Sequence, residues 1–124
     1  MSKAVSILCI NDSQTDQFIL KEILTQSYNP LDLHQTQTSK QAIVYLKKYK
    51  IDLIIQDIIG PGEMNGDQFL YWLKNHNDFY DIPVIIMSLL SADEIQHLSV
   101  LPHVFNHKPP IANQTLIKLI NTII

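Results

Sequence analysis

The chain has 124 residues, of which 46% are hydrophobic, and a formal net charge of −3 at pH 7. This length suits one domain with a substantial core and leaves no room for a second, so we expect a single domain over residues 1–124. Lys and Arg form no cluster dense enough to follow a phosphate backbone, and no apolar run approaches the ~20 residues that cross a bilayer, so we expect neither nucleic-acid binding nor a membrane span.

Residues 5–10 form the first predicted element, an apolar run rich in β-branched side chains that is typical of a strand covered on both faces. Asn11 and Asp12 break this run and no small-residue cleavage site follows, so it predicts a strand and not a signal peptide. Cys9, the single cysteine, excludes an internal disulfide and fits a reducing compartment. We therefore expect a buried structural thiol in a cytoplasmic protein.

A helix is predicted next, because Ser13 has the side chain of an N-cap and apolar residues then recur at helical spacing. These apolar residues are Phe18, Ile19, Ile23 and Leu24. The pattern stops at residues 28–30, Tyr-Asn-Pro, and residues 31–37 alternate in the manner of an exposed second strand.

The segment Thr38-Ser39-Lys40-Gln41 is a capping-box signature and predicts the start of a second helix. Its apolar side is marked by Ala42, Ile43, Leu46 and Tyr49.

The remaining elements continue the alternation of strand and helix. They are a strand at 51–57 followed by a Gly- and Pro-rich loop, a helix at about 65–76, a strand at 84–87, a short helix that begins at Ser91, a strand at 104–107, and a helix near the C-terminus. Five strands that alternate with five helices predict an α/β fold with a parallel sheet. We expect the flavodoxin-like, doubly wound strand order 2-1-3-4-5.

Polar side chains end or directly follow four of the predicted strands: Asn11 and Asp12, then Asp57, Ser88 and Lys108. The carboxyl ends of parallel strands meet at one edge of a sheet, so these side chains are predicted to lie together. Two neighbouring carboxylates favour a hard divalent cation, and Mg²⁺ suits a site that also binds phosphate. A hydroxyl and an ammonium group would then contact the oxygens of an anion held there.

These residues resemble the response-regulator receiver family: Asn11-Asp12, Asp57 with Pro61 four residues later, Ser88, and Lys108-Pro109. The resemblance covers essentially the whole chain. It implies that Asp57 accepts a phosphoryl group, that Asp12 binds Mg²⁺ directly, and that Ile59 offers its backbone carbonyl to the metal. Asn11 stands where a second acid is usual, and we expect it to act only weakly, from the outer shell.

The resemblance also implies a switch in which Ser88 closes on the phosphoryl group, Lys108 pairs with it, and the aromatic ring of Phe105 turns inward. A cis Lys108-Pro109 bond is a further implication. Several departures from the family pattern bear on function; among them, Asn11 removes a negative charge from the metal site, and the large Leu89 follows Ser88 in place of a very small residue.

The expected function is that of a single-domain response regulator, not an enzyme beyond self-catalysed phosphotransfer and dephosphorylation. Its expected partners are a sensor histidine kinase or histidine phosphotransfer protein and a downstream protein, or a second copy of the chain. Output is expected through the helix from Ser91, the strand 104–107 and the C-terminal helix.

Two other functions are alternatives to this one. A pseudo-receiver that binds proteins without phosphorylation is favoured by Asn11 and Leu89. A flavin-binding or hydrolytic enzyme is disfavoured, because no glycine-rich loop follows the first strand and no serine nucleophile elbow is present.

Overall fold

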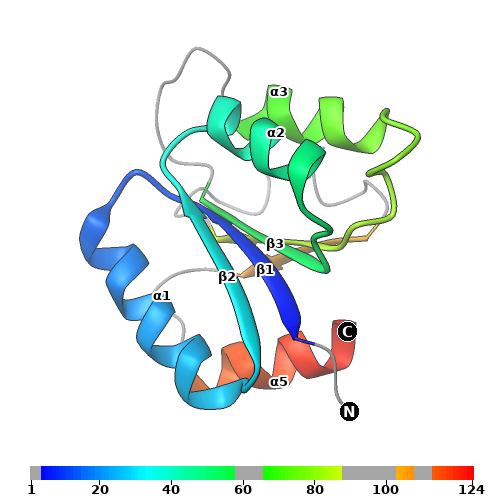
Figure 1. Ribbon diagram of the computed structural model, residues 1–124. Coiled ribbons are helices and arrows are strands. Elements are labelled where there is room, and N and C mark those ends of the chain that lie inside the picture. The colour runs from blue at the N-terminus through cyan, green and yellow to red at the C-terminus, as the bar shows by residue number, and fades with distance from the viewer. Residues whose placement is uncertain (1–3, 58–65, 88–102, 108–112) are drawn as a thin grey trace.

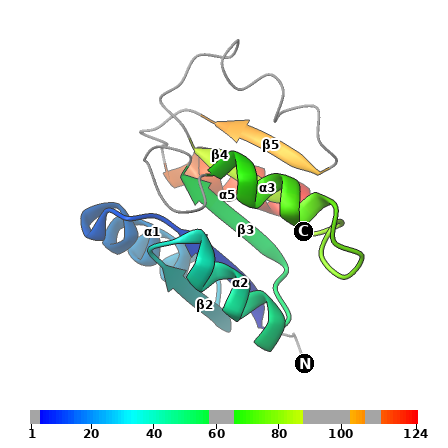
Figure 2. The ribbon, with the colours of Figure 1, turned by 90° about the horizontal axis from the view of Figure 1, so that it is seen from above.

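The structure is a computed structural model that describes residues 4–57, 66–87, 103–107 and 113–124. Its strands are β1 (Val5–Ile10), β2 (Leu31–Thr36), β3 (Leu53–Asp57), β4 (Val84–Met87) and β5 (Val104–His107). They form one parallel sheet in the order β2-β1-β3-β4-β5, which is visible from above in Figure 2. The predicted α/β class and strand order are confirmed.

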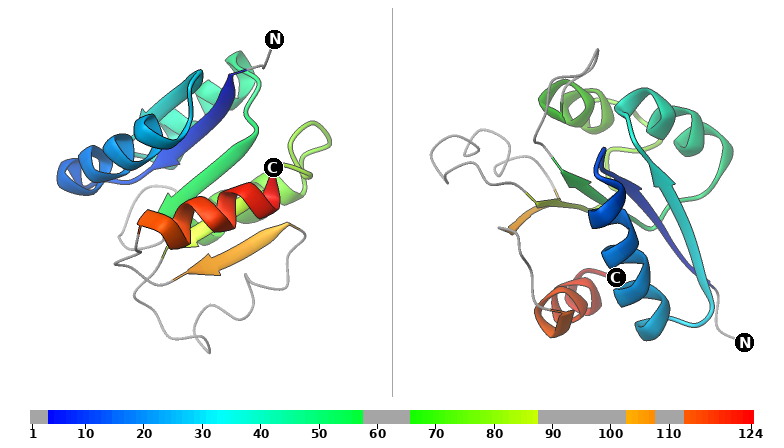
Figure 3. Two further views of the ribbon diagram at one scale, coloured as in Figure 1. Left: turned by 90° about the horizontal axis from the view of Figure 1, so that it is seen from below. Right: turned by 90° about the vertical axis from the view of Figure 1, so that its left-hand side faces the viewer.

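Helices cover both faces of the sheet (Figure 1). The described helices are α1 (Gln14–Ser27), α2 (Ser39–Lys48), α3 (Gly66–Lys74) and α5 (Asn113–Ile123). Helices α1 and α5 lie side by side on one face, as the view from below in Figure 3 shows, whereas α2 and α3 cover the other. The predicted helix that begins at Ser91 lies outside the described residues.

The two faces of the sheet hold two separate hydrophobic clusters, because successive strand residues point to opposite sides. The cluster beneath α2 and α3 includes Leu8, Leu46, Ile54, Phe69 and Ile86. The cluster beneath α1 and α5 includes Ile7, Leu24, Ile85, Leu116 and Ile120. All four residues of β4 are buried, which agrees with its continuous apolar sequence.

The predicted N-caps of α1 and α2 are present. The Ser13 hydroxyl accepts a hydrogen bond from the Asp16 amide at 3.2 Å, and the Thr38 hydroxyl accepts one from the Gln41 amide at 3.2 Å. The return bond of the second motif differs from a standard capping box: the Gln41 side chain accepts from the amide of Gln37, one residue before the cap.

The predicted apolar face of α1 was partly wrong. Phe18 and Ile19 are 63% and 49% exposed, and the buried stripe consists of Leu20, Ile23 and Leu24. Because α1 lies over β1 and the edge strand β2, only a narrow stripe of the helix meets the sheet. Within the part of the chain that the structure describes, no helix is long and apolar enough to cross a membrane.

Candidate functional site

The sheet register aligns the ends of the central strands. Ile10 on β1 pairs with Gln56 on β3, and Asp57 pairs with Met87 on β4. Asn11 and Asp57 therefore occupy the same row at the carboxyl edge of neighbouring strands, which lie about 4.8 Å apart in a sheet. The backbone thus brings the Asn11-Asp12 segment beside the predicted acceptor.

The turn between β1 and α1 is built around Asn11, which is only 4% exposed. Its backbone amide donates to the carbonyl of Thr36 at 3.0 Å, and its side-chain oxygen Oδ1 accepts from the amide of Ser13 at 2.8 Å. This second bond is a local Asx-type turn, a common role for asparagine at the start of a helix. Asn11 therefore shapes the turn, whatever it contributes to a metal.

Asp12 lies at the tip of this turn with an exposed side chain. Among the residues that the structure describes, its carboxylate accepts no hydrogen bond and forms no ion pair. An exposed carboxylate with its oxygens available has the chemistry of a Mg²⁺ ligand. The described residues contain no group of three or more His, Cys, Asp or Glu side chains that could by itself hold a metal ion.

Gln17 is a residue of the site that the sequence analysis missed. It lies in the first turn of α1, and its amide nitrogen Nε2 donates to the backbone carbonyl of Asn11 and, at 2.8 Å, to that of Thr36. The apolar spacing of α1 does not reveal Gln17, because its contribution is a pair of hydrogen bonds to main-chain oxygens.

Gln56 is a second residue that was not singled out. It precedes Asp57 on β3 and is only 1% exposed, and its alternation with Ile54 places it on the α2 and α3 face. A buried amide next to the predicted acceptor makes this end of β3 more polar than the strand interior.

The other predicted site residues are only partly covered. Asp57 ends β3, and Phe105 pairs with Ile85 in the middle of β5, but the structure describes only the backbone of each. Ile59, Ser88 and Lys108 lie outside the described residues, as does the predicted cis Lys108-Pro109 bond. Their roles stay predictions.

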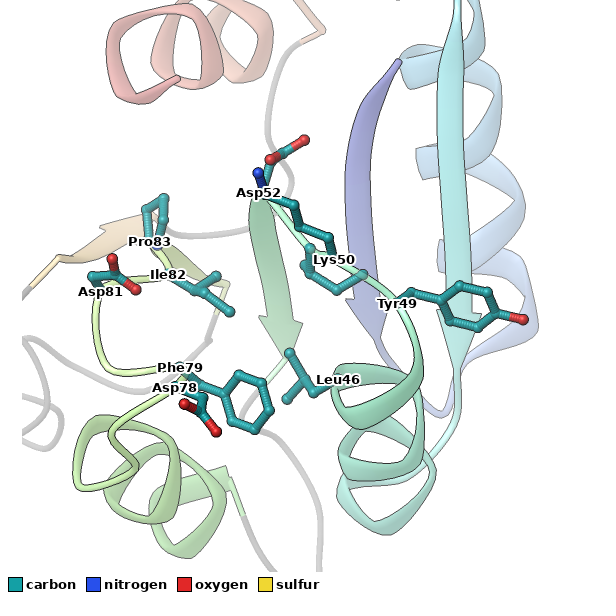
Figure 4. Close-up of a pocket in the computed structure, with 10 residues that line it drawn as sticks. Leu46, Tyr49, Lys50, Asp52, Asp78, Phe79, Asp81, Ile82 and Pro83 are labelled. Carbon is teal, nitrogen blue, oxygen red and sulfur yellow. The ribbon is translucent and has the colours of Figure 1, made fainter. Parts of the chain in front are cut away.

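A hollow of about 390 Å³ lies at the opposite, amino edge of the sheet (Figure 4). Residues that precede β3 and β4 line it, together with the end of α2 and the segment after α3: Leu46, Tyr49, Lys50, Ile51, Asp52, Asp78, Phe79, Asp81, Ile82 and Pro83. Asp52 accepts a hydrogen bond from the Ser6 amide at 2.9 Å, and its carboxylate points away from the Phe79 ring. This hollow is separate from the Asp12 and Asp57 edge.

Burial alters the acidity of Cys9 and of Lys74. Complete burial raises the pKa of the Cys9 thiol to about 12, so the predicted structural thiol is confirmed and the nucleophilic thiolate is suppressed. Burial lowers the pKa of Lys74 to about 8, while Asp81 opposes this shift. The Lys74 ammonium donates to the carbonyls of Tyr80 at 3.1 Å and Ile82 at 2.8 Å, which fixes the segment before β4.

Comparison with known proteins points to one family. The family model described as "Response regulator receiver domain" matches residues 7–120. The two-component response regulator ARR3 of Arabidopsis thaliana is 29% identical over 97 residues, which cover 70% of this chain and 41% of that protein. A probable cyclic di-GMP phosphodiesterase of Vibrio cholerae is 30% identical over 93 residues, which cover 75% of this chain and 20% of that protein. The chain thus spans well under two thirds of these relatives.

Solved structures agree with the family match. The signal receiver domain of a signal transduction histidine kinase from Syntrophus aciditrophicus is 29% identical, with a TM-score of 0.83 over 97% of this chain and 89% of that one. The chemotaxis protein CheY4 of Vibrio cholerae has a TM-score of 0.86 over 98% of this chain and 100% of that one, but at 17% identity it supports the fold alone. This chain belongs to the response regulator receiver domain family of two-component signalling.

Proposed function

We propose that the chain is a phosphoacceptor in a two-component phosphorelay, with Asp57 as the acceptor. The phosphoryl group is transferred from a phosphohistidine of a sensor histidine kinase or phosphotransfer protein: its P–N bond breaks and a P–O bond to the Asp57 carboxylate forms. The observation that supports this most strongly is the strand register, which sets Asn11-Asp12 beside Asp57 at one edge of the sheet.

Mg²⁺ is the proposed cofactor, and it supplies positive charge against the carboxylate and the phosphoryl oxygens. Asp12 and Asp57 bind it directly, the Ile59 carbonyl adds a neutral oxygen, and Asn11 contributes weakly from the outer shell. The exposed carboxylate of Asp12 fits this role.

Ser88 and Lys108 contact the phosphoryl oxygens, and Phe105 turns inward as the switch closes. These groups position and stabilise charge, which is most of what phosphoryl transfer requires. The protein therefore acts as a switch with at most self-catalysed transfer and dephosphorylation.

The output of the switch is binding to another protein in the cytoplasm. The proposed surface consists of the helix that begins at Ser91, β5 and α5. The partner bound through this surface can also be a second copy of the chain, which gives a homodimer.

Incubation with Mg²⁺ and acetyl phosphate tests the proposal. Intact-protein mass spectrometry is expected to show one added phosphoryl group on the wild type and none on Asp57→Asn. Asp78→Asn is the matched control, because Asp78 is exposed and lies near the amino edge of the sheet, and it should be modified like the wild type. An unmodified wild type under these conditions would overturn the proposal.

A pseudo-receiver that binds proteins without phosphorylation is the second candidate. The observation in its favour is the neutral Asn11 side chain, whose Oδ1 already accepts from Ser13. Calorimetric titration with Mg²⁺ separates the two, since only the phosphoacceptor requires the metal. Trp72 fluorescence is a poor substitute, because its ring packs against Phe69, His76 and Phe79 and not against the carboxyl edge.

A further inference from the structure

We infer that Gln17 is a positioning residue for the metal site: its side-chain amide clamps the turn that carries Asp12. This inference rests on the proposed function and adds to it a residue that touches neither metal nor phosphate. The contacts that carry it are the two hydrogen bonds from one nitrogen atom to the ends of two different strands.

The clamp joins three elements. Gln17 belongs to the first turn of α1, Asn11 follows the last residue of β1, and Thr36 is the last residue of β2. Nε2 of Gln17 donates to the carbonyls of both Asn11 and Thr36, and the Thr36 carbonyl also accepts from the Asn11 amide at 3.0 Å. The start of the turn is therefore fixed to β2 by its own amide and to α1 by the glutamine.

The two contacts require a side chain with two N–H donors at this position. Both partners are carbonyl oxygens, which accept only, and a primary amide has two N–H groups on one nitrogen. A carboxylate of the same length would place negative charge against two acceptors, and a thioether would leave both carbonyls without this donor.

The consequence reaches Asp12 through its two neighbours. Asn11 is held by the clamp and by its bond to Ser13, and Ser13 is held as the N-cap of α1, with its carbonyl accepting from the Gln17 amide at 3.0 Å. Asp12 thus extends from a segment that is fixed on both sides. A ligand that is already ordered loses less conformational entropy when the metal binds.

Gln35 provides a matched control. Its Nε2 donates to the backbone carbonyl of Gln17 at 2.7 Å, also in a part-buried setting, and among the described residues no hydrogen bond joins its side chain to the turn at residues 11–13. Gln35→Met and Gln17→Met therefore remove the same functional group and leave the same side-chain length, but only the second releases the turn.

The experiment measures Mg²⁺ affinity by calorimetry and amide hydrogen exchange by NMR in the wild type, Gln17→Met, Gln17→Glu and Gln35→Met. Thermal unfolding of each variant separates local from global effects. We expect Gln17→Met to weaken Mg²⁺ binding about tenfold, the lower end of what supporting residues around metals contribute. The Ser13 amide should exchange faster in Gln17→Met than in Gln35→Met, and Gln17→Glu should behave like Gln17→Met or worse.

The outcomes separate the clamp from the proposed function. If the wild type binds Mg²⁺ and Gln17→Met binds it as tightly as Gln35→Met does, the clamp is refuted and the proposed function stands. If the wild type binds no Mg²⁺, the proposed function fails, and the role of Gln17 in holding the turn is then decided by exchange at Ser13: faster exchange in Gln17→Met supports it, and unchanged exchange refutes it.

Discussion

Replacing Asn11 by Asp should strengthen Mg²⁺ binding and destabilise the metal-free protein. The side chain keeps its shape, and the carboxylate can still accept the hydrogen bond that Oδ1 now accepts from the Ser13 amide at 2.8 Å. The substitution adds a negative charge at a position that is only 4% exposed and that lies on the strand next to the one that ends in Asp57.

The size of both effects follows from the register. Neighbouring strands are about 4.8 Å apart, so side chains that start in the same row place their charges roughly 6 Å apart. Two like charges at that distance repel by about 1 to 3 kcal/mol when the effective dielectric constant lies between those of water and the protein surface. Mg²⁺ carries twice the charge and reverses the sign, so even the lower value becomes about 2 kcal/mol of attraction, which corresponds to roughly a thirtyfold gain in affinity.

Calorimetric titration with Mg²⁺ measures the gain, and urea unfolding with and without the metal measures the destabilisation. Asn121→Asp is the control: it is the same substitution on α5, where Oδ1 likewise accepts a hydrogen bond, from the Tyr28 hydroxyl at 2.7 Å, but on an exposed surface. Equal Mg²⁺ affinity for wild type, Asn11→Asp and Asn121→Asp would refute the placement of Asn11 beside the metal.

Three further outcomes are expected. Cys9 should react with a disulfide thiol reagent only at the rate of global unfolding, since burial raises its pKa to about 12. If Cys9 in the folded protein, below the urea unfolding transition, reacted as fast as a free thiol, this burial would be contradicted. Burial lowers the pKa of Lys74 from 10.5 to about 8, so the folded state binds this proton less tightly than the unfolded chain does. The free energy of unfolding of the wild type, compared with that of Lys74→Met, should therefore rise as the pH increases from 8 to 10.5. Phe69→Ala should cost about 3 to 5 kcal/mol of stability in chemical denaturation, because the ring is fully buried and its loss leaves a cavity.

The sequence predicted the strands well because their signal is local. Continuous β-branched and apolar runs such as residues 84–87 are buried on both faces, and their alternation with amphipathic segments leaves few topologies. The predicted strand boundaries were less accurate, since β3 begins at Leu53 and not at Ile51. Asp52 lies just before β3, where its side chain accepts a hydrogen bond from the backbone amide of Ser6.

The candidate site was predicted only in part, for a physical reason. Asn11, Asp12 and Asp57 were found because strand ends in a parallel sheet converge, a rule that depends on topology alone. Gln17 was not found, because its role depends on which carbonyls come within reach of one amide, and that is fixed only when α1 has packed against β1 and β2. Phe18 was counted among the apolar residues at helical spacing but is exposed, because spacing on a helix does not report how wide a stripe the sheet covers.

The cluster beneath α1 and α5 has a consequence for how the chain is made. Leu116 and Ile120 of α5 are fully buried there, against residues that stand up to 113 positions earlier in the sequence, such as Ile7. While a ribosome is still translating α5, only α1 covers this face of the sheet. Strands that have already emerged then expose apolar side chains to water. Nascent chains stalled before Asn113 should therefore associate with holding chaperones, and release should follow once the helix has left the exit tunnel.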